Sequence, residues 1–424
     1  MWRNVVKAKL VSIVSGLLLL SLLMYVAGLI TVHRDLFVWQ KVMRVRQLVT
    51  SLRATGRDMP QGSYSRRAPH VPDQSYVISD REAIAPGMLA VTRLNPEGVR
   101  YVIDLIAEDG TLLHSWPVEH ARLIPGGKTW ESPHGTKVLT DGSALVAFNS
   151  EPGLARIDGC GDAIWAIPDQ VYHHVIQADE AGGYWTWRSV KWGGSHDQVM
   201  LRFSESTGEA LEAIDLVDDV ILPYPVSGLL MATPEGFAFR RGAAAGEVWD
   251  IFHPNDIEPL PAALADAFPQ FKAGDLLISL RNLDMVAVID RETYRVLWVL
   301  QGPWRQQHDP DWQADGTITV FNNNRNRQLS HIVAVDPRTN ELSLPLGNSG
   351  PKYFSDTMGN HERLPNGNWL IVSANEGRVI EVTGVGQPVR EYSNVINDEY
   401  NAVVLHAEHL APDFFATFPV CAPK

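Results

Sequence analysis

The sequence predicts an all-β fold, a six-bladed β-propeller that follows an N-terminal transmembrane helix. Short apolar strands separated by turns fill the body of the chain, which has 33 Gly and 27 Pro among its 424 residues. A unit of strands recurs along this body and often ends near one of the 13 Trp, as in repeat architectures such as propellers. Residues 10–32 carry no charge, as a membrane-spanning helix requires.

The uncharged stretch is 23 residues long. At ~1.5 Å rise per residue it spans a ~30 Å hydrocarbon core with some tilt. No small-residue cleavage site follows it cleanly, so we expect a retained anchor rather than a cleaved signal peptide. Basic residues flank both ends, so the positive-inside count is nearly balanced. We expect a single-pass protein of the inner (cytoplasmic) membrane, with the propeller on the periplasmic or extracytoplasmic side.

The domain organisation follows from these features. We expect residues 1–34 to be the anchor, residues 35–84 a juxtamembrane helix and linker, and residues 85–424 a propeller domain closed by its C-terminal strand. Apolar residues near helical spacing, interleaved with basic ones, occupy residues 35–54; an interfacial helix and a plain helical stalk both fit. Residues 55–80 are rich in Gly, Pro, Ser and Arg, which is typical of a linker.

The charge of the body excludes one class of partner. Residues 1–70 carry 11 Lys/Arg against 2 Asp/Glu, whereas the rest of the chain carries a net charge of −22. Nucleic-acid binding needs a basic face that meets the phosphates. We therefore expect no nucleic-acid partner, and the basic part of the chain lies where a membrane would be.

The chain has two cysteines, Cys160 and Cys421, and they lack the spacing of a zinc site. Two interpretations remain open. They are two unrelated small residues, or they form a single bridge that ties the C-terminus to the body in an oxidising compartment.

Each repeat begins with a polar residue, often His, and continues through a strand, an Asp-Gly or Asn-Gly turn and a second strand. The segment 88–117 lacks such a start, and residues 401–418 supply a strand that it needs. That gives five whole units and one unit split between the two ends, which is how a propeller closes its ring. Residues 216–250 are either an insertion or a degenerate blade, so seven blades remain the alternative. The five polar starts are His134, His174, Asn255, His308 and His361.

These starts define the candidate site. The first strand of each propeller blade lines the central channel, so the residues just before it meet at one mouth. A ring of imidazoles there binds a metal, binds an anion or supplies a nucleophile, and the sequence leaves the three roles open. Arg325 and Arg327 follow the second strand of the His308 blade, and they lie either near the centre or on the rim.

Three phrases of the chain resemble the bacterial arylsulfotransferases, the PAPS-independent aryl sulfate transferases. The first runs from Gln307-His308 through Asp315–Phe321 to Arg327. The others are HPNDIEPL with LLISLRNLDMVAVID, in residues 253–290, and LPNGNWLIV at residues 364–372. The resemblance covers roughly residues 130–400. It implies a six-bladed propeller that transfers a sulfuryl group between phenols through a sulfohistidine, with no nucleotide cofactor.

The resemblance also implies roles. His308 and Arg327 match the sulfuryl-binding His and Arg of the family, His174 matches an earlier site His, and His361 is the best-placed nucleophile. We expect His134, Asn255 and Arg325 to bind substrate. The partners are a small phenolic sulfate donor, a phenolic acceptor and the membrane, with no cofactor and with a homodimer left open. The alternatives are a non-catalytic, membrane-anchored binding or assembly subunit and a metal-dependent enzyme that uses the His ring.

Overall fold

The computed structural model divides into two compact units, Met1–Ser63 and Tyr64–Lys424. Among the described residues no helix is both long enough and apolar enough to cross a membrane. The expected anchor lies outside the described residues except for Ser21, Met24 and Tyr25. The described residues are these three together with 65–67, 74–148, 150–192, 195–224, 252–347 and 349–421.

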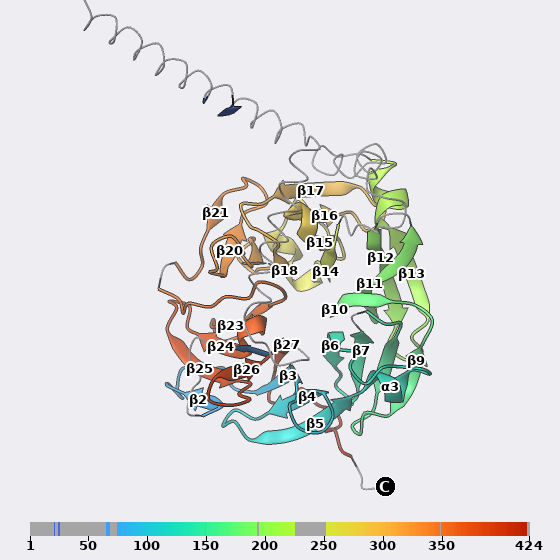
Figure 1. The fold of residues 1–424 in the computed structure, drawn as a ribbon. Coiled ribbons are helices and arrows are strands. Elements are labelled where there is room, and N and C mark those ends of the chain that lie inside the picture. Colours follow the sequence, from blue (N-terminus) through green and yellow to red (C-terminus); the bar gives the residue numbers. More distant parts are fainter. Residues whose placement is uncertain are drawn as a thin grey trace, which may run out of the picture. The chain divides into compact units, whose positions relative to one another are not determined.

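The second unit is a ring of six antiparallel sheets, which confirms the six-bladed propeller (Figure 1). In each blade the strands pair one after another from the innermost strand outward. Blade 1 is β27 (Val404–Leu410), β3 (Met88–Leu94), β4 (Tyr101–Ile106) and β5 (Leu112–Val118); blade 2 is β6 (Pro133–Val138), β7 (Ala144–Phe148), β8 (Leu154–Ile157) and β9 (Ala163–Ile167); blade 3 is β10 (Tyr172–Ala178), β11 (Gly183–Trp192), β12 (Ser195–Ser204) and β13 (Ala210–Asp215). Blade 4 is β14 (Pro254–Pro259), β15 (Leu276–Leu280), β16 (Met285–Ile289) and β17 (Val296–Gln301); blade 5 is β18 (His308–Trp312), β19 (Ile318–Asn322), β20 (His331–Val335) and β21 (Leu342–Ser343); blade 6 is β22 (His361–Arg363), β23 (Trp369–Ser373), β24 (Arg378–Val382), β25 (Pro388–Ser393) and β2 (Tyr76–Ile78).

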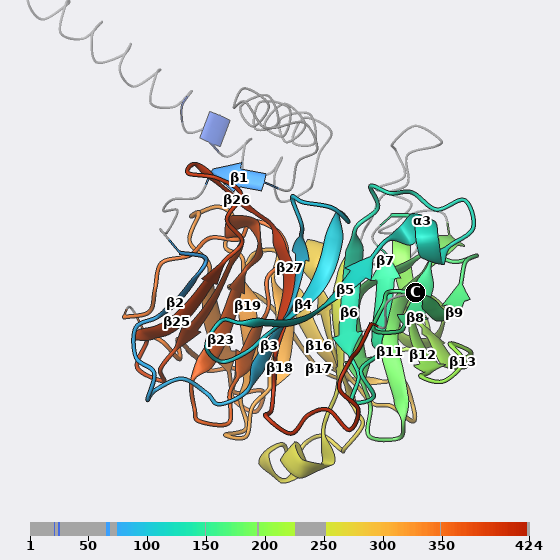
Figure 2. The same ribbon diagram turned by 90° about the horizontal axis from the view of Figure 1, so that it is seen from below.

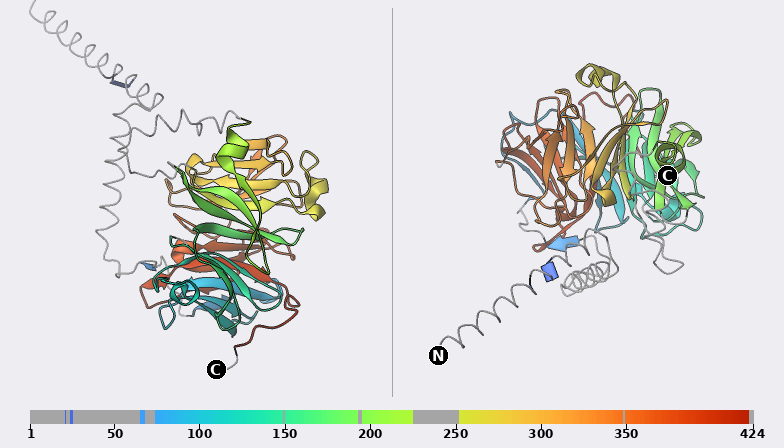
Figure 3. Two further views of the ribbon diagram at one scale, coloured as in Figure 1. Left: turned by 90° about the vertical axis from the view of Figure 1, so that its right-hand side faces the viewer. Right: turned by 90° about the horizontal axis from the view of Figure 1, so that it is seen from above.

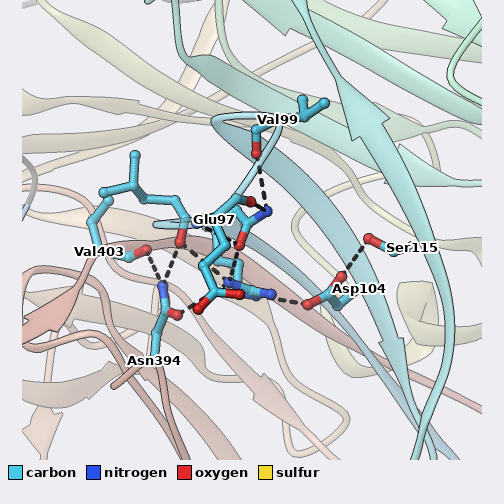
Figure 4. A network of polar contacts seen from close by, with 9 residues as sticks. Glu97, Val99, Asp104, Ser115, Asn394 and Val403 are labelled. Atoms are coloured by element: carbon cyan, nitrogen blue, oxygen red, sulfur yellow. Dashed lines mark hydrogen bonds and ion pairs between the residues drawn. The ribbon is translucent and has the colours of Figure 1, made fainter. Parts of the chain in front are cut away.

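The split blade is observed as predicted. β27, from the C-terminal end of the chain, pairs antiparallel with β3, from Val404 opposite Arg93 to Leu410 opposite Met88. A buried polar network reinforces this closure (Figure 4). Arg93 donates to Asp104 at 2.6 Å, and Asn394, which follows blade 6, donates to the carbonyls of Leu94 and Val403 at 2.9 and 3.1 Å. A strand from the C-terminal end thereby completes the blade that the first strands of the propeller begin, which closes the ring.

The turns explain why the predicted strands begin and end where they do. In the Asp141-Gly142 and Asp315-Gly316 turns, the carboxylate accepts the backbone N–H two residues later, at 3.1 and 3.0 Å. The glycines have φ of 84° and 82°, a conformation that other residues adopt only with strain. Asn366-Gly367 repeats the arrangement in blade 6. These local hydrogen bonds reverse the chain between the first two strands of a blade.

Six apolar clusters hold the described ring together, and each lies between two neighbouring blades. Tryptophans add a directional contact across four of the interfaces. The indole N–H groups of Trp116, Trp165, Trp187 and Trp298 donate to acceptors of the next blade at 2.8–3.1 Å. A buried indole needs such a partner for its polar N–H. The recurring Trp of the sequence therefore links neighbouring blades by a hydrogen bond.

Two short strands lie in residues that the sequence assigned to a linker. β2 adds a fifth, outer strand to blade 6, and β1 (Ser65–Arg67) pairs with β26 (Tyr400–Ala402). The propeller unit therefore begins before residue 85. β1 and β26 lie at one end of the propeller, and the 3-10 helix η3 (Ala262–Ala267) projects from the other end (Figure 2 and Figure 3).

The segment left open as an insertion or a blade begins with the π-helix η1 (Leu216–Ile221), and residues 225–251 lie outside the described residues.

The cysteines form a disulfide, Cys160–Cys421, across a sequence separation of 261 residues. The C-terminal residues leave β27 and cross to blade 2 (Figure 2). There the N–H groups of Ala416 and Thr417 donate to the Thr140 carbonyl at 2.8 and 3.1 Å. Of the two interpretations of the cysteines, the structure has the single bridge that ties the C-terminus to the body.

Candidate functional site

The candidate site lies where the innermost strands of the blades have β-bulges. The pairing register shifts in β6, β10, β14, β18 and β27, at or next to His134, His174, Asn255, Asp309 and Leu405. Such bulges re-aim side chains and bend the strand. His174 and Asp309 have φ of 62° and 52°, the left-handed region that costs a residue with a β-carbon free energy. Because the innermost strands run in the same sense around the axis, these bulges meet at one mouth of the channel.

Four imidazoles gather at this mouth. The ring centroids of His134, His173 and His174 lie 3.9–4.3 Å apart, and His253 lies 5.0 Å from His174. They come from blades 2, 3 and 4. The side chain of His174 is buried, and its Nε2 has no hydrogen-bond partner. Burial, followed by the neighbouring histidines, holds the pKa of His174 well below its usual value, so this imidazole is neutral at physiological pH.

His308 enters the same region from blade 5 in a defined tautomer. The amide nitrogen of Asn323 donates to the carbonyls of Ser355 and Met358 at 2.8 and 2.7 Å. The amide oxygen of Asn323 therefore faces His308 Nδ1, at 2.7 Å, and can only accept. His308 Nδ1 must carry the hydrogen, so a neutral ring keeps its lone pair on Nε2.

The charge state of His308 follows from its surroundings. Burial, followed by the positive charge of Arg281, lowers the pKa of His308 to about 3. Arg281 is itself buried, and its backbone N–H donates to the His253 carbonyl at 3.1 Å. The unprotonated imidazole of His308 therefore lies within the electrostatic influence of a buried guanidinium.

Carboxyl groups line the channel beyond the imidazoles. Two pairs come from neighbouring strands, Asp256 with Glu258 on β14 and Asp309 with Asp311 on β18, and all four side chains line one cavity. Burial raises the pKa of Glu258 to about 8, with the negative charge of Asp309 as the second cause. Burial also raises the pKa of Asp256 and of Asp311 well above the usual value, again with Asp309 as the second cause. Glu258 is therefore mostly protonated at neutral pH.

A cavity of about 120 Å³ joins the two zones. Its polar walls combine imidazole, amide, ammonium and carboxyl groups from several blades, namely His134, Lys137, His174, Gln177, Asn255, Asp256, Glu258, His308, Asp309, Asp311, Asn360 and His406. The half-buried Lys137 pairs with Glu408, which keeps the pKa of Lys137 above its usual value despite the opposing effect of desolvation. The cavity therefore brings neutral imidazoles, carboxyl groups and an ammonium group together.

The structure brings together four of the predicted residues: His134, His174, Asn255 and His308 all line this cavity. His361 is buried beside it with both ring nitrogens engaged. Its Nδ1 lies 2.9 Å from Asp309 Oδ2 and its Nε2 lies 2.8 Å from Thr319 Oγ1. His361 therefore positions Asp309, and both of its ring nitrogens already have partners in this structure.

The two predicted arginines are not brought into the cavity. The exposed Arg327 lines a separate pocket with His331 and Leu342. Arg325 is also exposed; it donates to Gln306 at 2.8 Å and lies near Asp356. Both stay on the rim because the chain turns outward after Asn323.

Sequence reasoning missed His173, His253 and Arg281. His173 and His253 each lie within two residues of a predicted position, in HHV and HPND, so the histidine content of these phrases was a usable signal. Arg281 follows the second strand of blade 4 in ISLRNL. Arg325 and Arg327 also follow the second strand of their blade, though not at the equivalent position, so an arginine after this strand was a usable signal.

A comparison with known families places the chain in one of them. The Arylsulfotransferase (ASST) family model matches residues 135–395, more than half of the chain. The chain belongs to the arylsulfotransferase family. The matched range includes blades 2 to 5, most of blade 6 and nearly all of the cavity. The resemblance seen in the sequence is thus confirmed for the propeller.

Several solved structures are similar to this arylsulfotransferase-family chain. A protein of unknown function from Bacteroides caccae is 13% identical with a TM-score of 0.49, and the alignment covers 72% of this chain and 93% of that one. A functionally unknown protein from Desulfotomaculum acetoxidans is 10% identical with a TM-score of 0.44, over 76% and 99%. Virginiamycin B lyase from Staphylococcus aureus is 12% identical with a TM-score of 0.36, over 62% and 71%. No curated protein matches the chain.

Proposed function

We propose that this propeller transfers a sulfuryl group from a phenolic sulfate ester to a phenolic acceptor, through a sulfohistidine formed on His308. One observation carries the proposal. His308 lines the cavity as a neutral imidazole whose Nδ1 is held by Asn323, so the lone pair stays on Nε2. His361, the nucleophile favoured by the sequence, has both nitrogens engaged.

The reaction has two balanced halves. His308 Nε2 attacks the sulfur of the donor, an N–S bond forms, and the S–O bond breaks with its electron pair leaving on the phenolate oxygen. The acceptor oxygen then attacks the same sulfur, the N–S bond breaks and Nε2 regains its lone pair. Arg281, whose charge acts on His308, stabilises the negative charge on the sulfuryl oxygens. No nucleotide is consumed.

A carboxyl group of the channel donates a proton in the first half-reaction and takes one back in the second. The leaving phenolate gains a proton and the acceptor phenol loses one, so the cycle is neutral. Glu258 lines the same cavity, and its pKa of about 8 lets it hold a proton near neutral pH. A general acid is most effective when its pKa lies near the working pH. We assign proton delivery and recovery to Glu258.

The proposal extends to location. Residues 10–32 anchor the protein in the inner membrane as a single pass, and the propeller lies on the periplasmic side. The Cys160–Cys421 disulfide supports this location, because disulfides persist in oxidising compartments. A homodimer stays a prediction, which analytical ultracentrifugation checks.

The test uses purified full-length protein, 4-nitrophenyl sulfate as donor and a phenol as acceptor, without PAPS. We expect release of 4-nitrophenol, ping-pong kinetics and a sulfuryl adduct on the peptide that carries His308. His308→Asn should abolish the adduct and the transfer. His331→Asn is the matched control, because His331 lies in the same blade but lines the separate pocket. Transfer that survives in His308→Asn would contradict the assignment of the nucleophile.

A further inference from the structure

We infer that His134, His173 and His174 form a binding site for one divalent transition-metal ion of the zinc class. The site lies at the histidine mouth of the channel and does not include His308. The site shares the cavity with His308 but does not use it as a ligand, so metal binding is measurable whether or not the chain transfers sulfuryl groups.

The positions of the nitrogen atoms fit a metal. One ring nitrogen from each of the three histidines lies within 4.8 Å of the other two. A tetrahedral zinc ion with Zn–N bonds of about 2.0–2.1 Å holds its ligand nitrogens about 3.4 Å apart. Rotations of the side chains that move each nitrogen by about 1 Å therefore complete the site, with no rearrangement of the blades.

The nitrogen of His174 that lacks a hydrogen-bond partner indicates that a ligand binds there. His174 is 5% exposed, and its Nε2 is buried with no hydrogen-bond partner. A buried polar atom left in this state destabilises the fold. A metal–nitrogen bond removes that cost, since the neutral imidazole nitrogen is a preferred ligand of zinc.

The backbone is built to bring these rings together. Gly135 follows His134, and a β-carbon at Gly135 would lie 1.9 Å from the carbonyl oxygen of His174. Only glycine permits this approach of β6 to β10. His174 itself is held at a φ of 62°. Strain of this kind persists where the surrounding structure imposes it, and it clusters at functional sites.

The donor set selects the metal. Three imidazoles suit zinc, copper and nickel, whereas magnesium and calcium prefer oxygen ligands. A second group in the described residues, Asp309, Asp311 and His361, also has its ligand atoms within 4.8 Å of one another. Both nitrogens of His361 are already engaged there, so we assign the metal to the histidine trio.

The test is direct metal analysis of the full-length protein. Protein stripped with chelator and titrated with ZnCl₂ should bind one equivalent of zinc, and X-ray absorption at the zinc edge should show imidazole nitrogens at about 2.0 Å. The double variant H173Q/H174Q should lose at least 100-fold in zinc affinity. His406→Gln, which removes another histidine of the same cavity, should keep it.

The X-ray absorption spectrum is recorded on wild-type protein, so this test holds even where a variant fails to fold. Oxygen-only coordination, or no bound zinc, would overturn the inference. Equal loss in His406→Gln would do the same. A third overturning result is zinc binding that Asp311→Asn removes and the double histidine variant keeps, because it would assign the metal to the acidic group.

Discussion

The disulfide allows a quantitative prediction about stability. The change is the double substitution of Cys160 and Cys421 by serine. The bridge spans 261 residues of sequence, and in the chain-entropy relation a loop of that length contributes about 5.6 kcal/mol at 25 °C. Measured values often fall below this relation, so we expect the free energy of unfolding to drop by about 3–6 kcal/mol.

The assay is equilibrium unfolding in urea, followed by tryptophan fluorescence, on full-length protein. Oxidised wild type should unfold at a higher urea concentration than the double variant, and wild type with reductant should match the variant. The remaining contacts of the tail at Thr140 are two backbone hydrogen bonds, worth only about 1 kcal/mol each. They cannot replace the bridge. Equal unfolding midpoints for oxidised wild type and the double variant would refute the reasoning.

Three further predictions concern the channel. Asn323→Asp places a carboxylate against His308 Nδ1, so the pKa of His308 should rise and transfer should fall at acidic pH where wild type stays active; unchanged pH–rate profiles would contradict the tautomer argument. The pKa of Glu258 is raised to about 8 in the folded protein, so the folded protein binds this proton more tightly than the unfolded chain does. The free energy of unfolding should therefore fall as pH rises from about 4.5 to about 8, by at most about 1.4 kcal/mol per pH unit from this group, and Glu258→Gln should reduce that slope in urea titrations at each pH. Gly135→Ala should destabilise the protein by about 1–3 kcal/mol in the same assay, because its β-carbon meets the His174 carbonyl, whereas Gly384→Ala, whose β-carbon makes only an ordinary contact, should cost much less.

Most of the fold could be predicted because its signals are local. Turns such as Asp141-Gly142 and Asn366-Gly367 mark the reversals, and the strands beside them are apolar. The strand missing from the first unit identified residues 401–418 as its partner, and β27 is that strand. β1 and β2 could not be predicted in the same way. Each has three residues, and pairing with β26 and β25 rather than local pattern forms them.

The site was predicted only in part, because bulges shift the register by one residue. A regular repeat made His308 equivalent to Asn255, whereas the structure places Asp309 at that bulge. Counting along the chain also did not show which way it turns after Asn323, so the sequence left open whether Arg325 and Arg327 lie near the centre or on the rim. The bridge between Cys160 and Cys421 depends on where the C-terminal tail ends, which no local signal encodes.

The same bulges explain why the imidazole and carboxyl side chains gather at one mouth of the channel. In a regular strand alternate side chains point to opposite faces, so His173 and His174 would point apart. The register of β10 shifts after His173. As a result the ring centroids of His173 and His174 lie 3.9 Å apart, and both lie within 4.3 Å of the ring centroid of His134. In β18 the shift at Asp309 leaves His308 in the cavity while Asp309 bonds the ring of His361. A propeller with regular inner strands would carry the same residues without bringing them together, so both the proposed transfer and the proposed metal site depend on the irregular pairing.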